Sequence, residues 1–187
     1  KPTYGLVSRY GVQAASESLD HIGPMTRSTE DAAIMLEAIA GHDPNDPTSI
    51  QVATPDIMGT LKMGIKGISI GIDNDYISDG VETSLLTSIN NAVEKLADLG
   101  AEIVPVEIPS NKDERNDALG AIFSKETAFA HRETYPSRKA EYGNCFKDFL
   151  DYGHSVTEAK YESALQFKEN FSKQFRRLYS EVDVIAS

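Results

Sequence analysis

The central part of the chain has the clearest pattern of hydrophobic and polar positions. Residues 68–72 alternate in the manner of a strand, and apolar side chains then recur at helical spacing over 81–99. The run 103–108 predicts a second strand, near the edge of its sheet because Pro105 has no N–H to donate to a ladder. Together these elements predict a right-handed βαβ unit over residues 68–108, and with it the α/β fold class.

The same periodicity predicts further helices between Ser28 and Gly41, over 116–134, over 146–152, and from Thr157 along an apolar stripe that runs from Tyr161 to Val182. Ser28 and Thr157 are side chains suited to capping a helix N-terminus. Pro136 should end the second of these helices, because the residue before a proline is pushed out of helical geometry. Gly153 should close the third, and residues 48–66 are expected to form an irregular connection with at most one short helical turn.

Two more short segments, near residues 6–9 and 183–186, are expected to join the same sheet. The predicted fold is therefore a mixed sheet with helices on both faces. The chain begins at Lys1, within a segment that already looks structured, and it stops inside a predicted strand. We therefore expect residues 1–187 to form a single incomplete domain of a longer protein.

Composition and charge exclude several classes of partner. The 187 residues carry 18 Lys and Arg against 29 Asp and Glu, a net charge of −11, so direct binding to nucleic acid is not expected. No apolar run reaches the roughly 18 residues that span a bilayer, so no membrane partner is expected either. The single cysteine, Cys145, cannot form an internal disulfide, which fits a reducing, cytoplasmic location.

Local motifs reveal no catalytic centre. The sequence has no G-x-S-x-G elbow, phosphate-binding loop or H-E-x-x-H motif, and its four histidines show no metal-ligand spacing. His131 is better explained as a hydrogen-bonded residue than as an acid or base, and Cys145 as an inert structural thiol than as a nucleophile. Asp20 precedes Ile22-Gly23-Pro24, where a carboxylate normally braces a turn. Glu126 could point inward from its predicted helix, although a solvated face or a capping role is the usual outcome.

Several motifs together resemble the amidase signature family. They are K-P-T-Y-G-L-V-S-R-Y-G at 1–11, S-L-D-H-I-G-P-M-T-R-S at 18–28, E-D-A-A at 30–33 and I-A-G-H-D-P at 39–44. The first 47 residues carry the specific part of the resemblance, and weaker matches continue in order to the end of the chain, including the L-G-A-E turn at 99–102, Glu126 and V-D-V at 182–184.

The resemblance implies hydrolysis of a small-molecule amide by a Ser–cis-Ser–Lys triad, without a metal or organic cofactor. In the family the lysine and both serines precede the K-P-T-x-G motif, so the resemblance implies no catalytic residue in this chain, and Lys1 is not the catalytic lysine. By their placement in the family pattern, Ile122 and Phe123 are candidates for lining the substrate pocket, with core packing as the alternative. The implied partner is the remainder of the same polypeptide, and a homodimer is left open.

The residues also bear on which branch of the family the chain resembles. The opening motif resembles the glutaminase subunit of the tRNA-dependent amidotransferase. That subunit carries Glu-Ala-Ser-Ser-Asn-Leu where this chain has Glu-Thr-Ala-Phe-Ala-His at 126–131, and the arginine expected to hold a glutamine carboxylate has only Lys147 as a counterpart within 144–153. A stand-alone amidase is therefore favoured.

Two alternatives lie outside amide hydrolysis. The chain could be a non-catalytic interaction or structural domain, a relative whose active half has been lost. A nucleotide-binding βαβ domain is disfavoured, because the link at 73–76 is acidic and lacks the glycines of a phosphate cradle.

Overall fold

The computed structural model describes residues 3–109 and 112–186, and their contacts divide into two compact units. We call residues 3–62 and 117–165 the helical unit. The sheet unit takes its described residues from 63–116 and 166–186. Two long helices, α5 (Lys112–Ala130) and α8 (Glu158–Leu178), contribute residues to both units.

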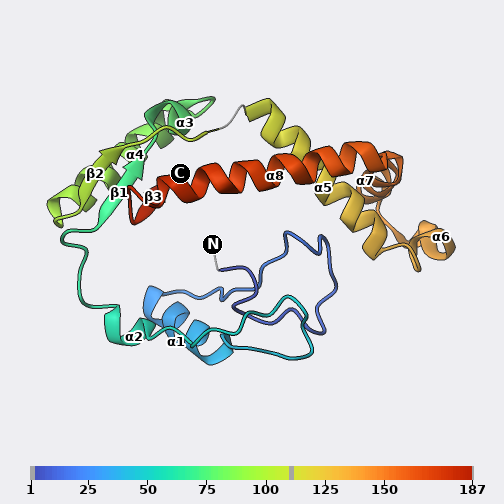
Figure 1. Cartoon of the computed structure of the whole chain (residues 1–187), viewed down its shortest axis with the longest axis horizontal. Helices are drawn as coiled ribbons and strands as arrows, with labels where there is room; N and C mark the ends of the chain where they lie inside the picture. Colours follow the sequence, from blue (N-terminus) through green and yellow to red (C-terminus); the bar gives the residue numbers. More distant parts are fainter. Residues whose placement is uncertain (1–2, 110–111, 187) are drawn as a thin grey trace. The chain divides into compact units, whose positions relative to one another are not determined.

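The sheet unit contains the predicted strand–helix–strand arrangement (Figure 1). Its elements are β1 (Ser69–Ile72), the short α3 (Asn74–Ser78), α4 (Thr83–Asp98), β2 (Glu102–Pro105) and β3 (Val184–Ala186). Among the described residues the strands form one sheet in the order β2-β1-β3, and both pairs are parallel. Pro105 lies on β2 at the edge, opposite Ile72, as the sequence predicts, and the strand expected near 183–186 is β3.

The core of the sheet unit follows from the alternation of side chains along β1. Ile70 and Ile72 are buried together with Ile77, and apolar residues of α4 pack against them: Leu86, Ile89, Val93 and Leu96. A side chain at position 71 would lie on the opposite face of the strand. A Cβ there would lie 3.1 Å from both Val106 and Val182, so side chains already fill that space.

Asp73 joins the end of β1 to the segments on either side of it. Its carboxylate caps α3 by accepting from Tyr76 N (2.9 Å), and it also accepts from Ile108 N (2.6 Å). Burial raises the pKa of Asp73, but these backbone donors outweigh it and the net pKa is lowered. The start of α3 is therefore occupied by a carboxylate, which agrees with the view that this turn is unsuited to phosphate.

The expected strand near residues 6–9 lies outside the sheet. Val7 makes a single antiparallel bridge with Ala40, within the helical unit. Gly5 and Gly11 flank this segment with φ of 76° and 82°, and the chain turns at both of them. The α/β class is confirmed, but the sheet within the described residues is parallel rather than mixed.

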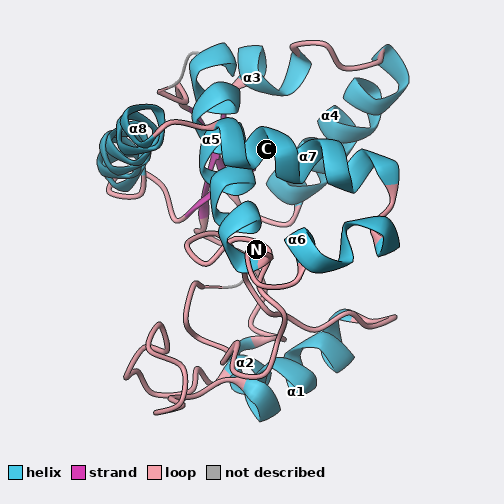
Figure 2. Cartoon of the chain, turned by 90° about the vertical axis from the view of Figure 1, so that its right-hand side faces the viewer, coloured by secondary structure: helices cyan, strands magenta, loops and turns pink. Residues whose placement is uncertain are grey.

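The helical unit contains α1 (Thr29–Ile39), α2 (Ile57–Thr60), α6 (Tyr135–Arg138), α7 (Asn144–Ser155) and parts of α5 and α8. Figure 2 shows that loops make up much of residues 3–62. Ser28 Oγ accepts from Asp31 N (3.1 Å) and Thr157 Oγ1 accepts from Lys160 N (3.2 Å), which confirms both predicted helix caps. The four residues of α2 are the short helical turn expected in the 48–66 connection.

The predicted helix over 116–134 is displaced by about one turn. In the structure α5 begins at Lys112 and ends at Ala130. Pro136 does not end it. The proline lies in the first turn of the separate helix α6, where its missing N–H is no disadvantage.

Gly153 does not close a helix as the sequence predicts, because it lies inside α7 and is buried. A Cβ at this position would lie 2.1 Å from the backbone oxygen of Ser124 and 2.9 Å from Ala128 Cβ. Gly153 is thus a packing contact between α5 and α7, which run close together in Figure 2.

No described helix is long and apolar enough to cross a membrane.

The contact at Gly153 leads to a matched pair of substitutions. We expect Gly153→Ala to lower the free energy of unfolding of the intact protein by at least about 2 kcal/mol, because a methyl group there overlaps backbone atoms. Gly120→Ala, on α5, has nothing within 4 Å of the added Cβ and should raise stability by about 0.5–1 kcal/mol. Urea unfolding measures both. Similar effects of the two substitutions would contradict the proposed helix contact.

Candidate functional site

Glu126 is the centre of a hydrogen-bond network in the helical unit. From the described residues its carboxylate accepts four hydrogen bonds: from Ser16 Oγ (2.6 Å), Ser18 N (2.8 Å), Ser18 Oγ (2.8 Å) and Tyr161 Oη (2.8 Å). Ser16 is fully buried, and Glu126 itself is partly buried. The inward orientation is therefore correct, and the alternatives of a solvated helix face or a helix cap are wrong for Glu126.

The network fixes the protonation of its members. Burial raises the pKa of Glu126, but the hydroxyl and amide donors of Ser16, Ser18 and Tyr161 outweigh burial and lower the net pKa. Burial and the bond to Glu126 raise the pKa of Tyr161 to about 12. At neutral pH Glu126 is thus charged and Tyr161 carries its proton. A carboxylate has about four acceptor sites, all of them engaged here, so Glu126 is a poor candidate for a general base.

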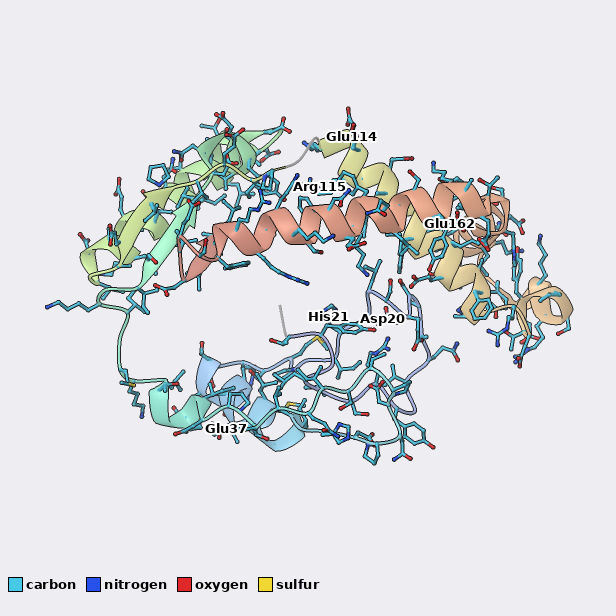
Figure 3. All side chains as sticks on the ribbon, in the orientation of Figure 1. Asp20, His21, Glu37, Glu114, Arg115 and Glu162 are labelled. Carbon is cyan, nitrogen blue, oxygen red and sulfur yellow. The ribbon has the colours of Figure 1, made fainter. Side chains whose placement is uncertain are left out.

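The loop that carries both serines is held from its other side by further contacts. Asp20 Oδ2 accepts from Ala15 N (2.8 Å) and Ser16 N (3.1 Å), which confirms its predicted role in bracing a turn (Figure 3). The backbone oxygen of Glu17 accepts from Tyr4 Oη and Arg9 Nη1, both at 2.8 Å. This loop therefore has a defined conformation although it lies in neither a helix nor a strand.

A second carboxylate fixes the segment that precedes this loop. Asp46 accepts from Thr48 Oγ1 (2.6 Å), Arg9 N (2.8 Å) and Thr48 N (2.8 Å), and these bonds lower its pKa to about 2. Ser8 Oγ donates to the neighbouring Asp43 (2.6 Å). On α1, Glu37 accepts from Met58 N (2.7 Å) and so holds the start of α2 (Figure 3).

A cavity of about 680 Å³ lies beside Glu126, with Ser18 and Tyr161 in its wall. Most of the surface that lines it is apolar, and its apolar residues are Ala14, Phe129 and Ala130. Its charged lining residues are Glu17, Lys125, Glu126, Arg132 and Glu158. Such a volume is typical of sites that bind small molecules.

The cations at the cavity already have partners. Lys125 Nζ donates to Val156 O (2.9 Å) and lies 3.3 Å from Glu158. Arg132 stacks over the ring of Phe129, 3.9 Å from its centroid, and donates to the backbone oxygen of Phe129 (2.8 Å). Arg132 thus supports one face of an aromatic ring that is 65% exposed.

The two predicted pocket residues lie elsewhere on α5. Ile122 is only 2% exposed, which agrees with the core-packing alternative. Phe123 is 39% exposed, and its ring centroid lies 5.3 Å from that of Phe149. Neither residue is among the described side chains that line the cavity beside Glu126. Their role in a substrate pocket stays a prediction.

The remaining candidates show no reactive arrangement. His131 Nδ1 lies 3.0 Å from Tyr142 Oη, and its ring contacts Phe146, as expected for a hydrogen-bonded histidine. Cys145 is exposed near the start of α7. Within residues 3–109 and 112–186, no group of three His, Cys, Asp or Glu side chains could hold a metal ion.

Comparison with known proteins agrees with this α/β architecture. The amidase family model matches residues 1–187. A glutamyl-tRNA(Gln) amidotransferase subunit of Caldanaerobacter subterraneus subsp. tengcongensis is 34% identical, over 99% of this chain and 43% of the relative. The chain thus spans less than half the length of that relative.

Solved structures show the same likeness. The corresponding amidotransferase subunit of Thermotoga maritima superposes with a TM-score of 0.77 at 29% identity, over 99% of this chain and 40% of that one. A second structure is described as a vestigial protein complex that reveals the evolutionary origins of an s-triazine catabolic enzyme. It superposes with a TM-score of 0.87 at 25% identity, over 97% of this chain and 39% of that one.

These matches define the class as the amidase signature fold. The chain belongs to the amidase family, and the resemblance seen in its motifs is confirmed.

The network makes a prediction about stability and pH. Glu126→Gln replaces one carboxylate oxygen by a donor, so two hydrogen bonds are lost, and we expect a loss of about 2–3 kcal/mol at pH 7. Because the folded pKa of Glu126 is lowered, its contribution is complete above the ordinary value of 4.5 and disappears as the pH falls through the folded pKa. The difference between the variant and the native protein should therefore shrink in acid.

Denaturant unfolding of the intact protein between pH 3 and pH 7 measures this effect. Glu158→Gln is the matched control, because the Glu158 side chain is 73% exposed and its ion pair with Lys125 is correspondingly weak. A difference for Glu126→Gln that stays constant with pH would contradict the ionised state assigned to Glu126.

Proposed function

We propose that this chain is part of an amidase that hydrolyses a small-molecule carboxylic amide. The support is the family match over all 187 residues, together with the solved structures that share the fold. The chemistry implied by the family is attack of a serine on the amide carbonyl, loss of the amine, and hydrolysis of the acyl-enzyme by water. The serines and lysine of this triad have no counterpart in the residues described above, so the remainder of the polypeptide is proposed as the essential partner.

The chain itself contributes a wall of the substrate pocket. The cavity beside Glu126 is formed by side chains whose positions are fixed by the Glu126 network and by the Asp20 turn. Ile122 and Phe123 remain proposed as further pocket residues. We also propose that residues 1–187 form one incomplete domain and that the protein works in the cytoplasm without a cofactor, as the single cysteine and the family resemblance suggest.

A second candidate is the glutaminase subunit of a tRNA-dependent amidotransferase. The names of the curated relatives favour it. Phe129 and Ala130 weigh against it, because they occupy positions at which the subunit motif has serine and asparagine and they make this part of the cavity wall apolar. A glutaminase should prefer L-glutamine by a large factor, since a site built for polar groups rejects ligands that leave those groups unpaired.

The proposal predicts that the intact protein releases ammonia or an amine from carboxylic amides. Replacing the serine nucleophile outside this chain by alanine should lower the rate by at least about 10³-fold, and a metal chelator should leave it unchanged. A coupled ammonia assay across a panel that includes L-glutamine measures these effects and separates the two candidates.

Two results would count against amide hydrolysis as proposed. One is activity that disappears with a chelator and returns with zinc. The other is the absence of hydrolysis across the panel, which would favour the non-catalytic alternative.

A further inference from the structure

We propose that the cavity beside Glu126 binds the apolar end of an uncharged amide and accepts a hydrogen bond from its N–H at Tyr161 Oη. The inference rests on the proposed function, because it names the class of amide that the protein takes. Two observations support it: the side chains that line the cavity, and the direction of the hydrogen bond from Tyr161 to Glu126.

The direction of one hydrogen bond sets the polarity at Tyr161. A phenol has a single proton, and Tyr161 donates it to Glu126 Oε1 (2.8 Å). Toward any further partner Tyr161 Oη can therefore only accept. Glu126 has no acceptor site left, since the described donors fill all four. A ligand that reaches Tyr161 must bring a donor, such as an amide N–H, and a carboxylate cannot replace it.

The charges at the cavity also disfavour an anion. Glu17, Glu126 and Glu158 line it, against Lys125 and Arg132. Both cations are already engaged, Lys125 with Glu158 and a backbone oxygen and Arg132 with the ring and backbone of Phe129. A free carboxylate would lose its hydration without gaining an unused cation, so a neutral ligand is favoured.

The apolar part of the cavity selects the body of the ligand. Phe129 is 65% exposed, and the Arg132 guanidinium stacked on it supports the ring. Ala14 and Ala130 line the same cavity with small side chains. A planar apolar group fits this arrangement, because aromatic rings attract each other when stacked with an offset or edge to face.

The experiment uses three small probes on the intact protein, with binding measured by calorimetry. Benzamide carries both the ring and the amide, benzoate has a carboxylate in place of the amide, and acetamide lacks the ring. We expect benzamide to bind at least about tenfold more tightly than either of the others, in line with the discrimination that a buried ring or an unpaired polar group provides.

Substitutions test the two contacts separately. Phe129→Ala should weaken benzamide about tenfold and leave acetamide within about twofold. Leu119→Ala is its matched control, because Leu119 lies on the same helix and is 51% exposed. Tyr161→Phe should weaken benzamide about fivefold by removing the acceptor, and Tyr179→Phe, at a side chain that is 54% exposed, should have no effect.

The binding experiments test the cavity, and their results can be told apart from those of the hydrolysis assay. Equal binding of benzamide and benzoate, no binding of benzamide, or equal behaviour of Phe129→Ala and Leu119→Ala would overturn the inference. If Tyr161→Phe fails to fold, the exposed Phe129 still provides the test. Benzamide binding that depends on Phe129 in a protein without amide hydrolysis would support the cavity and refute the proposed function. Amide hydrolysis by a protein in which Phe129→Ala leaves benzamide binding unchanged would support the proposed function and refute the role of the cavity.

Discussion

The carboxylate of Glu126 is the point at which three segments far apart in the sequence meet. Ser16 and Ser18 come from a loop more than 100 residues before it, and Tyr161 from a helix 35 residues after it. A charge in this partly buried position is stabilised by the hydrogen bonds it receives, and the buried hydroxyl of Ser16 in turn has Glu126 as its acceptor. Among the described residues no buried side-chain nitrogen or oxygen lacks a partner, so the loop and both helices depend on one another.

The position of Glu126 depends in turn on how α5 packs. Ser124 and Ala128 lie one turn apart on the face that meets Gly153 of α7. Glu126 follows Ser124 by two residues, which rotates its side chain by about 200° and directs it to the opposite face. One face of α5 is therefore used for close helix packing and the other for the polar network and the cavity. A shift of α5 at the Gly153 contact would move Glu126 as well.

Features that local residues determine could be predicted from the sequence, and features that depend on distant contacts could not. Ser28 and Thr157 cap their helices as expected, and Pro105 lies on an edge strand. Gly153 looks like a helix stop in the sequence, because nothing nearby shows that another helix passes over it. Ser16, Ser18 and Tyr161 could not be assigned to the network for the same reason. Their sequence separations from Glu126 form no pattern, and Tyr161 also fits the apolar stripe of its helix.

Tyr161 and Glu126 stabilise each other's protonation state, which gives the cavity a constant polarity near neutral pH. The charge on Glu126 helps to raise the pKa of Tyr161 to about 12, and the phenol proton of Tyr161 helps to lower the pKa of Glu126. Both groups therefore keep their protonation state around neutral pH, and Tyr161 Oη stays an acceptor there. The arrangement changes only in acid, when Glu126 becomes protonated and no longer holds the phenol proton. An uncharged amide, which does not titrate either, suits a site whose hydrogen bonds stay the same around neutral pH.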